Sequence, residues 1–153
     1  LGLRAPLAQD WRLGLGVGTG LYVFSFVFTL VWSLLANPEI FQQQTAAADQ
    51  VFGAFSENLS DGLLLAFSTG FGEEILFRGA LQPVFGVLPT SLLFVMAHLQ
   101  YAFTPATLIL FVVTLGFAWL RQNASTTAAI IGHMVYNLIP FVLVALLGPG
   151  AAV

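Results

Sequence analysis

Residues 13–36 read LGLGVGTGLYVFSFVFTLVWSLLA and carry no charged side chain over 24 positions. A transmembrane helix needs about 20 apolar residues to cross a hydrocarbon core about 30 Å thick. This stretch is therefore long enough to cross a bilayer as one helix. It is too long for the apolar core of a cleavable signal peptide, and no clear cleavage site follows it.

The composition of the whole chain points the same way. Hydrophobic residues make up 58% of the 153 residues and charged residues only 7%, whereas a soluble domain has about 25% charged residues. So few charges cannot cover a surface in water, and we expect the outer surface to contact the lipid bilayer. The four basic residues exclude a nucleic-acid-binding face. The absence of cysteine excludes disulfides and thiolate metal sites.

Four further apolar stretches follow the first one. The predicted membrane spans lie near 13–36, 62–83, 88–103, 105–121 and 127–147. A short interfacial helix is expected around 46–57. The predicted fold is all-α, a polytopic transmembrane bundle of about five helices that forms a single membrane domain over residues 1–153.

Arginine placement predicts the orientation. Arg4 and Arg12 precede the first span and Arg121 follows the fourth, so five spans place all three on one side. Cytoplasmic loops carry the excess of basic residues, which predicts a cytoplasmic N-terminus. Because the chain begins at Leu1 rather than methionine, we expect a processed or partial chain.

Glycines are frequent in the first span. Gly14, Gly16, Gly18 and Gly20 follow no strand, so they predict close helix packing rather than a nucleotide-binding loop. Gly16 and Gly20 lie four residues apart on one face, which we expect to pack on the catalytic helices or on another chain. The aromatic residues that follow, from Tyr22 to Trp32, are expected to face outward.

Ionisable groups inside predicted spans are few and costly, so each one indicates a functional site. Glu74 and Arg78 are four residues apart on one helix face and are predicted to form an ion pair. Glu73 lies about 100° away around the helix and is left for acid–base chemistry. The alternative is that all three form a buried cluster that fixes the helix register.

Two more spans carry polar groups. His98 is predicted to lie deep in its span, one turn after Phe94, and His133 lies one turn before Asn137. An imidazole N–H beside an amide could hold an oxyanion. Ordinary hydrogen bonds between membrane helices are the alternative. Glu73 and the two histidines could also hold zinc, but the HExxH pattern is absent, and we predict no metal or other cofactor.

Three motifs carry a family resemblance. EEILFR at 73–78 resembles an EExxxR motif, FVMAH at 94–98 an FxxxH motif, and HMVYN at 133–137 an HxxxN motif. Their order and separation resemble the CAAX protease and bacteriocin-processing (CPBP, Abi) family, which includes the type II CAAX prenyl endopeptidases. The resemblance covers roughly residues 60–145, which we take as the catalytic core.

The resemblance implies a glutamate-dependent intramembrane protease. In it, Glu73 and His98 would activate water, and His133 and Asn137 would form the oxyanion hole. We expect these four side chains to converge on one internal cavity. The residues that support the site would be Glu74, Arg78 and Phe94. The family core has more helices than this chain, which resembles a minimal or truncated member.

The predicted function is therefore an intramembrane endopeptidase that hydrolyses peptide bonds of membrane-associated proteins or peptides. One alternative is a non-proteolytic scaffold, assembly factor or subunit of a larger membrane complex that keeps the motif residues as a structural network. Another is a proton-linked transporter, which would use the same buried groups as a relay. The expected partners are the bilayer and a membrane protein or peptide substrate, joined by other membrane subunits if the scaffold alternative holds.

Overall fold

The computed structural model describes residues 1–42, 45–46, 59–98 and 104–148. Its principal elements are α1 (Ala8–Leu35), α3 (Leu59–Glu74), η1 (Ile75–Leu81), α4 (Gln82–Phe85), α5 (Val87–Ala97), α6 (Pro105–Asn123) and α7 (Thr126–Leu147). All of these are helices, η1 being a π-helix, which confirms the predicted all-α fold. The interfacial helix expected at 46–57 lies, apart from residue 46, outside the described residues.

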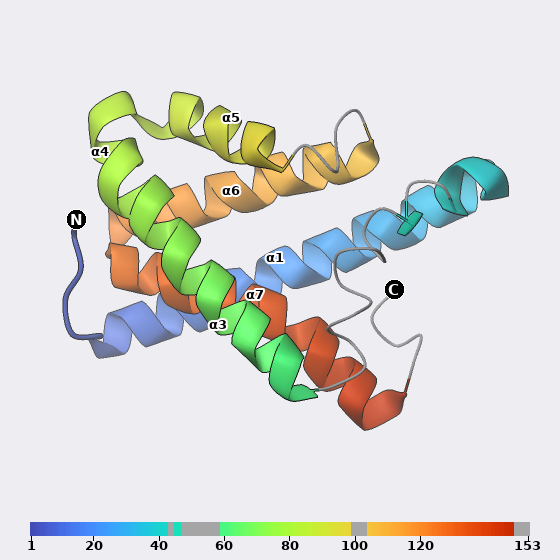
Figure 1. Ribbon diagram of the computed structural model, residues 1–153, viewed down its shortest axis with the longest axis horizontal. Coiled ribbons are helices and arrows are strands. Elements are labelled where there is room, and N and C mark those ends of the chain that lie inside the picture. The colour runs from blue at the N-terminus through green and yellow to red at the C-terminus, as the bar shows by residue number, and fades with distance from the viewer. Residues whose placement is uncertain (43–44, 47–58, 99–103, 149–153) are drawn as a thin grey trace.

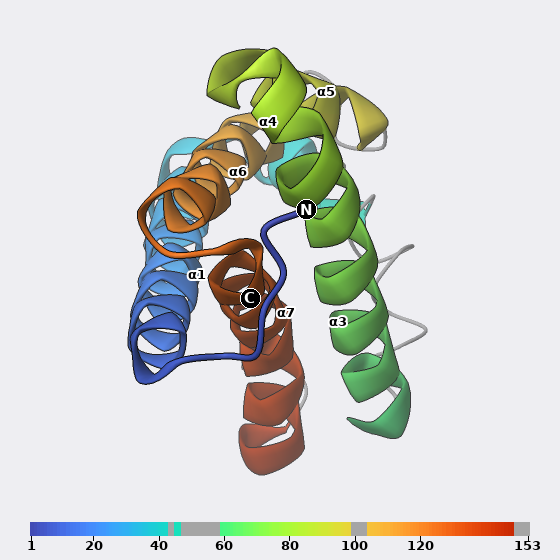
Figure 2. The ribbon, with the colours of Figure 1, turned by 90° about the vertical axis from the view of Figure 1, so that its left-hand side faces the viewer.

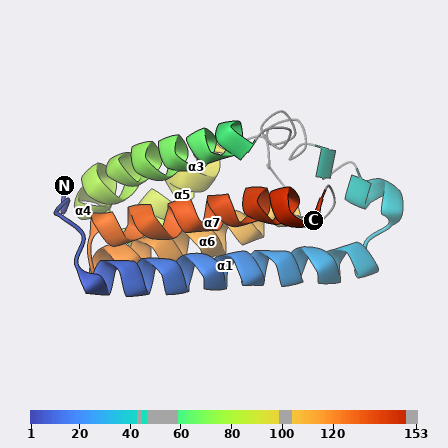
Figure 3. The same cartoon turned by 90° about the horizontal axis from the view of Figure 1, so that it is seen from below.

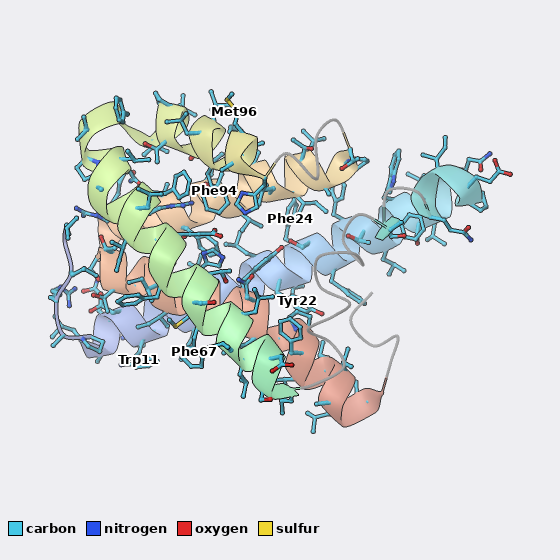
Figure 4. The ribbon with its side chains drawn as sticks, viewed as in Figure 1. Trp11, Tyr22, Phe24, Phe67, Phe94 and Met96 are labelled. Atoms are coloured by element: carbon cyan, nitrogen blue, oxygen red, sulfur yellow. The ribbon has the colours of Figure 1, made fainter. Side chains whose placement is uncertain are left out.

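Three of the helices are long and apolar enough to cross a membrane, namely α1, α6 and α7. With 28 residues, α1 has a length of about 42 Å. Large apolar side chains cover the outside of the bundle, among them Phe24, Phe67 and Met96, which point away from the helices (Figure 4). Such a surface suits lipid rather than water, and the protein is an integral membrane protein.

The second and third predicted spans are less regular. The second is a helical run from Leu59 to Phe85 that changes from α to π geometry and back. The third is shorter than expected, because α5 ends at Ala97 and His98 is its C-cap residue with φ −106° and ψ 50°. The expectation that His98 lies deep in a helix was therefore wrong. The rest of that predicted span, residues 99–103, lies outside the described residues.

The turn between α4 and α5 depends on a glycine. Gly86 has φ +83°, a backbone conformation that side-chain-bearing residues rarely adopt. It lets the chain leave α4 and start α5 at the next residue (Figure 1). This reversal returns α5 over α6, so that Phe94 points into the bundle (Figure 4).

Helix α7 lies at the centre of the bundle. It packs against α1 on one side and α3 on the other, while α6 lies beside both α1 and α7 (Figure 2). Seen from below, α1 and α7 run side by side over much of their length (Figure 3). The central position of α7 matters for the site, because this helix carries His133 and Asn137.

Glycines do mediate the contact between α1 and α7, but on a different face from the one predicted. A Cβ atom added to Gly18 would lie 2.4 Å from the carbonyl oxygen of Gly132, and one added to Gly14 would lie 2.7 Å from Ile131. Around Gly16 and Gly20, no such atom would meet a neighbour within 4 Å. The expected contact of Gly16 and Gly20 with helices of this chain was therefore wrong, because all the glycines alternate in sequence and four-residue spacing suits either pair. A contact of this face with another chain stays a prediction.

The aromatic residues after these glycines divide between two surroundings. Phe24 and Phe26 are exposed on the bundle surface, as expected. Tyr22 instead packs inward against Tyr136, with 6.4 Å between the ring centroids. The first span thus meets lipid with only part of its aromatic surface.

One end of the bundle holds the start of α1, the end of α6 and the start of α7 (Figure 1). Asp10 is fully buried there, pairs with Arg4 and accepts a hydrogen bond of 2.6 Å from Ser125. Ser125 also caps α7 by accepting from the backbone N–H of Ala128. This contact joins the starts of α1 and α7, at the end of the bundle that also carries Arg121. The cytoplasmic orientation of this end stays a prediction.

Candidate active site

Small residues on α3 bring the paired glutamates to α7. The buried stripe on α3, with four-residue spacing, consists of Gly62, Ala66, Gly70 and Glu74. Gly70 lies so close to α7 that an added Cβ would come within 2.7 Å of Met134. Glu74, the next member of the stripe, therefore enters the interface with α7. Glu73 is turned about 100° away from it.

The π-helix begins directly after Glu74. π-Helical turns are rare and are frequently found at functional sites. Within η1, Phe77, Arg78 and Gly79 are all buried. The carbonyl oxygen of Arg78 accepts a hydrogen bond of 3.1 Å from Nε of Arg121 on α6. The π-helix thus places the arginine of the EExxxR motif inside the bundle and joins its backbone to α6.

Glu74, Arg78, His133 and Thr114 form what we call the Glu74 cluster. Nε of Arg78 lies 3.2 Å from Oε2 of Glu74, an ion pair whose geometry is not aligned as a hydrogen bond. This contact confirms the predicted pairing. Oε1 of Glu74 lies 2.8 Å from Nδ1 of His133. Arg78 donates through Nη2 to the backbone oxygen and the hydroxyl of Thr114, at 2.9 and 2.5 Å.

The Glu74 cluster is closed off from its surroundings. The side chains of Glu74 and Arg78 are 0% and 1% exposed, and that of His133 is 7% exposed. A carboxylate can only accept a hydrogen bond, so with Glu74 ionised, Nδ1 of His133 carries the proton in this contact. The second ring nitrogen of His133, Nε2, is then the atom left for other chemistry.

Two phenylalanines frame the cluster. The ring of Phe117 on α6 stacks on the imidazole of His133, with centroids 4.7 Å apart and planes at 17°. The ring of Phe94 on α5 lies 4.7 Å from the guanidinium carbon of Arg78, a favourable cation–π distance. Phe94 also stacks on His98, with centroids 4.6 Å apart. The predicted supporting residue Phe94 therefore lies between the Glu74 cluster and His98.

Glu73 and His98 form a second, looser pair. Nε2 of His98 lies 3.8 Å from Oε2 of Glu73, and the two side chains are 20% and 27% exposed. Nδ1 of His98 lies 2.8 Å from the backbone oxygen of Phe94, which can only accept, so Nδ1 carries a proton. In the neutral ring, Nε2 then presents its lone pair. The 3.8 Å separation is too long for a direct hydrogen bond, and Oε2 of Glu73 is buried without a hydrogen-bond partner among the described residues.

Asn137 reaches a partner that the motifs do not include. Its Nδ2 donates a hydrogen bond of 3.0 Å to the hydroxyl of Thr69 on α3. Asn137 lies one helical turn after His133 on α7, and Thr69 lies one turn before Glu73 on α3. The two helices therefore hold the polar groups of the HxxxN and EExxxR motifs against each other.

The structure divides the four predicted site residues among three contacts. Glu73 faces His98, whereas His133 bonds to Glu74 and Asn137 bonds to Thr69. Sequence reasoning missed Thr69, Thr114 and Phe117. Only Thr69 left a usable signal, its position one turn before Glu73. Threonine and phenylalanine are otherwise common in membrane helices and show no special pattern.

The two histidines do not share a carboxylate, and the cavity lies away from them. The two imidazoles lie toward different carboxylates, and the described residues contain no group of three or more potential metal ligands. A cavity of about 180 Å³ lies elsewhere, lined by Gln82, Pro83, Gly86, Val87, Arg121 and Gln122. The internal cavity that we expected for the four site residues is not this one.

The arrangement of the three motifs agrees with a comparison against known families. The model of the family described as type II CAAX prenyl endopeptidase Rce1-like matches residues 55–139, more than half of the chain. The chain belongs to this family. The resemblance inferred from the motifs is thereby confirmed. No curated protein and no protein of known structure matches the chain.

The Rce1-like match includes all three motifs, from Glu73 to Asn137. It also includes Thr69 and all of α3, so the small-residue stripe lies inside the family region. Helix α1 lies outside the match. In this Rce1-like protein, α1 supplies the glycine contact that supports the far side of α7.

Proposed function

We propose that this protein is an intramembrane endopeptidase that hydrolyses peptide bonds of membrane-associated proteins or peptides with a water activated by Glu73 and His98. The observation that carries the proposal is the Glu73–His98 pair. It is the less buried of the two glutamate–histidine pairs, and Oε2 of Glu73 has no hydrogen-bond partner among the described residues, a role that an entering water would fill. Membership of an endopeptidase family supports the same reaction.

Glu73 and His98 would have different roles in activating the water. The water would lose a proton to Glu73 as its oxygen attacks the scissile carbonyl carbon, while Nε2 of His98 orients it through its lone pair. The resulting tetrahedral intermediate carries the negative charge on the former carbonyl oxygen. When the C–N bond breaks, the proton held by Glu73 passes to the leaving nitrogen. The products are a new carboxylate and a new amine.

His133 and Asn137 would stabilise the intermediate. His133 bonds to Glu74 through Nδ1, and with a second proton on Nε2 the ring would donate to the oxyanion. Asn137 uses one N–H for Thr69 and keeps a second. A preorganised donor of this kind is worth roughly 100- to 1,000-fold in rate. The Glu74 cluster would hold the His133 ring without taking part in proton transfer.

The substrate class follows from the family description. A CAAX prenyl endopeptidase acts on a lipid-modified protein terminus, so we propose a prenylated peptide as the substrate. The apolar outer surface of the bundle would let such a lipid reach the site from the bilayer. A prenyl chain would hold the peptide at the membrane surface and raise its local concentration.

The test uses the purified protein in lipid vesicles and a fluorescence-quenched farnesylated peptide ending in a CAAX sequence. Glu73→Gln is expected to lower kcat about 1,000-fold or more, because glutamine cannot accept the water proton. Glu39→Gln, which alters an exposed carboxylate outside the site, is the matched control and should keep full activity. A Glu73→Gln protein that cleaves like the parent would overturn the mechanism. If the unprenylated peptide is cleaved equally well, the proposed requirement for a prenyl group is wrong, but the hydrolytic mechanism is not contradicted.

A non-proteolytic membrane subunit is the second candidate. One observation favours it, since Nδ1 of His133 is bonded to Glu74 in a buried structural cluster. New protein N-termini in membranes from cells that carry the parent protein, compared with cells that carry Glu73→Gln, separate the candidates. A protease produces termini that the variant lacks, whereas a subunit leaves both sets identical.

A further inference from the structure

Thr69 has a hydrogen-bonding pattern that limits how Asn137 can lie. Its hydroxyl donates to the backbone oxygen of Leu65 at 2.7 Å. A hydroxyl has one proton and two acceptor lone pairs, so toward Asn137 it can only accept. The Asn137 group that faces Thr69 must then be the N–H side of the amide, as the 3.0 Å contact from Nδ2 shows.

This contact determines which amide atoms are left over. With one N–H directed at Thr69, Asn137 keeps its second N–H and its carbonyl oxygen for other partners. Rotation of the amide by 180° would exchange nitrogen and oxygen and would place two acceptors, the amide oxygen and the Thr69 hydroxyl, against each other. The hydrogen bond to Thr69 therefore selects one amide orientation, in which an oxyanion on the side of Thr69 would meet an N–H group rather than the carbonyl oxygen.

The position of Thr69 connects the two sides of the site. Thr69 and Glu73 are four residues apart on α3, so their side chains lie on one helix face, one turn apart. Asn137 reaches the same face from α7. Thr69 thus holds the amide on the side of α3 that carries the water-activating carboxylate, rather than on the side of the Glu74 cluster.

We propose that Thr69 is a positioning residue that orients the Asn137 amide toward the oxyanion, an inference that rests on the proposed function. The neighbouring Ser68 makes the same kind of contact with its own helix, donating to Leu65 at 3.1 Å. It is exposed on α3. Ser68 therefore offers a matched control for losing a hydroxyl at this point of the helix.

The test measures kcat and KM for Thr69→Val, Thr69→Ser and Ser68→Ala with the farnesylated peptide in vesicles. Valine keeps the shape of threonine but cannot accept, so kcat should fall roughly 10- to 100-fold with KM within about twofold, since a misplaced group costs up to roughly 100-fold. Serine restores the acceptor and should stay within about threefold of the parent. Ser68→Ala should match the parent.

A double variant separates positioning from a general structural role. If Thr69 acts through Asn137, adding Thr69→Val to Asn137→Ala should lower kcat by less than about twofold more. A full additional 10- to 100-fold loss would overturn the proposal, as would a Thr69→Val protein with the parent kcat. Glu73→Gln in the same assay tests the reaction itself. An inactive Glu73→Gln beside a fully active Thr69→Val rejects only the role of Thr69.

Discussion

Glu73 and Glu74 are neighbours in the chain but belong to different regions of the molecule. Glu74 is fully buried and holds Arg78 and His133 within 3.2 and 2.8 Å. Glu73 is 27% exposed and faces His98 across 3.8 Å. A rotation of about 100° along one helix places one carboxylate in the packed interface and leaves the other beside a histidine at the end of α5. The comparison suggests that one glutamate stabilises the fold and the other carries out chemistry.

Among the variants that test this difference, Arg78→Ala should have the largest effect on stability. Arg78→Ala leaves Glu74 buried without its cation, which typically costs about 3–5 kcal/mol. We expect a large drop in the midpoint of thermal unfolding in detergent and in the amount of protein in membranes. Arg12→Ala removes an exposed arginine and is the matched control. If Arg78→Ala unfolds at the temperature of the parent, the Glu74 cluster does not stabilise the fold.

The two histidines give the next contrast. His133→Ala removes a buried partner of Glu74 and the stacking on Phe117, so we expect a loss of about 1–3 kcal/mol of stability. His98→Ala removes a ring that is 20% exposed and has no close ionic contact, and should cost less than about 1 kcal/mol. Both variants should lose most peptide cleavage. Thermal unfolding curves of equal midpoint for the two would contradict the comparison.

Among the changes to the Glu74 cluster, removal of the Thr114 hydroxyl should have the smallest effect on stability. Thr114→Val keeps the side-chain shape and the backbone oxygen but removes the hydroxyl that Arg78 contacts. Loss of one hydrogen bond to a charged group costs about 1.5–3 kcal/mol, and the remaining backbone contact should hold the loss near the lower value. Cleavage by the folded variant should stay near that of the parent. If kcat falls while the unfolding midpoint stays unchanged, Thr114 contributes to the reaction rather than to the stability of the fold.

Parts of the fold could be predicted from the residues and parts could not. The absence of charge over residues 13–36 was sufficient to predict a membrane helix, because lipid tolerates few alternatives to a helix. The face by which α1 packs on the other helices of this chain was predicted wrongly. Glycines at every second position offer equal spacing on two faces, and only the position of Gly132 on α7 selects Gly14 and Gly18.

The candidate site shows the same division. The spacing of Glu74 and Arg78 predicted their ion pair, because residues four apart on a helix are neighbours. His133 was expected to form an oxyanion hole with Asn137, and its contact with Glu74 was not predicted because it depends on how α3 packs on α7. The partner of Asn137 could not be predicted either, since Thr69 lies 68 positions away in the chain.

By itself, the sequence determined that this protein lies in the membrane, that its elements are helices and that three motifs supply its polar interior. These properties depend on composition and on contacts within one helical turn, which local spacing describes fully. Only the tertiary structure decided which glutamate is buried, where α5 ends and which side chain holds Asn137. Those outcomes depend on the rotation of α3, α5 and α7 relative to one another. That rotation is set by close contacts of small residues such as Gly18 and Gly70 with distant parts of the chain.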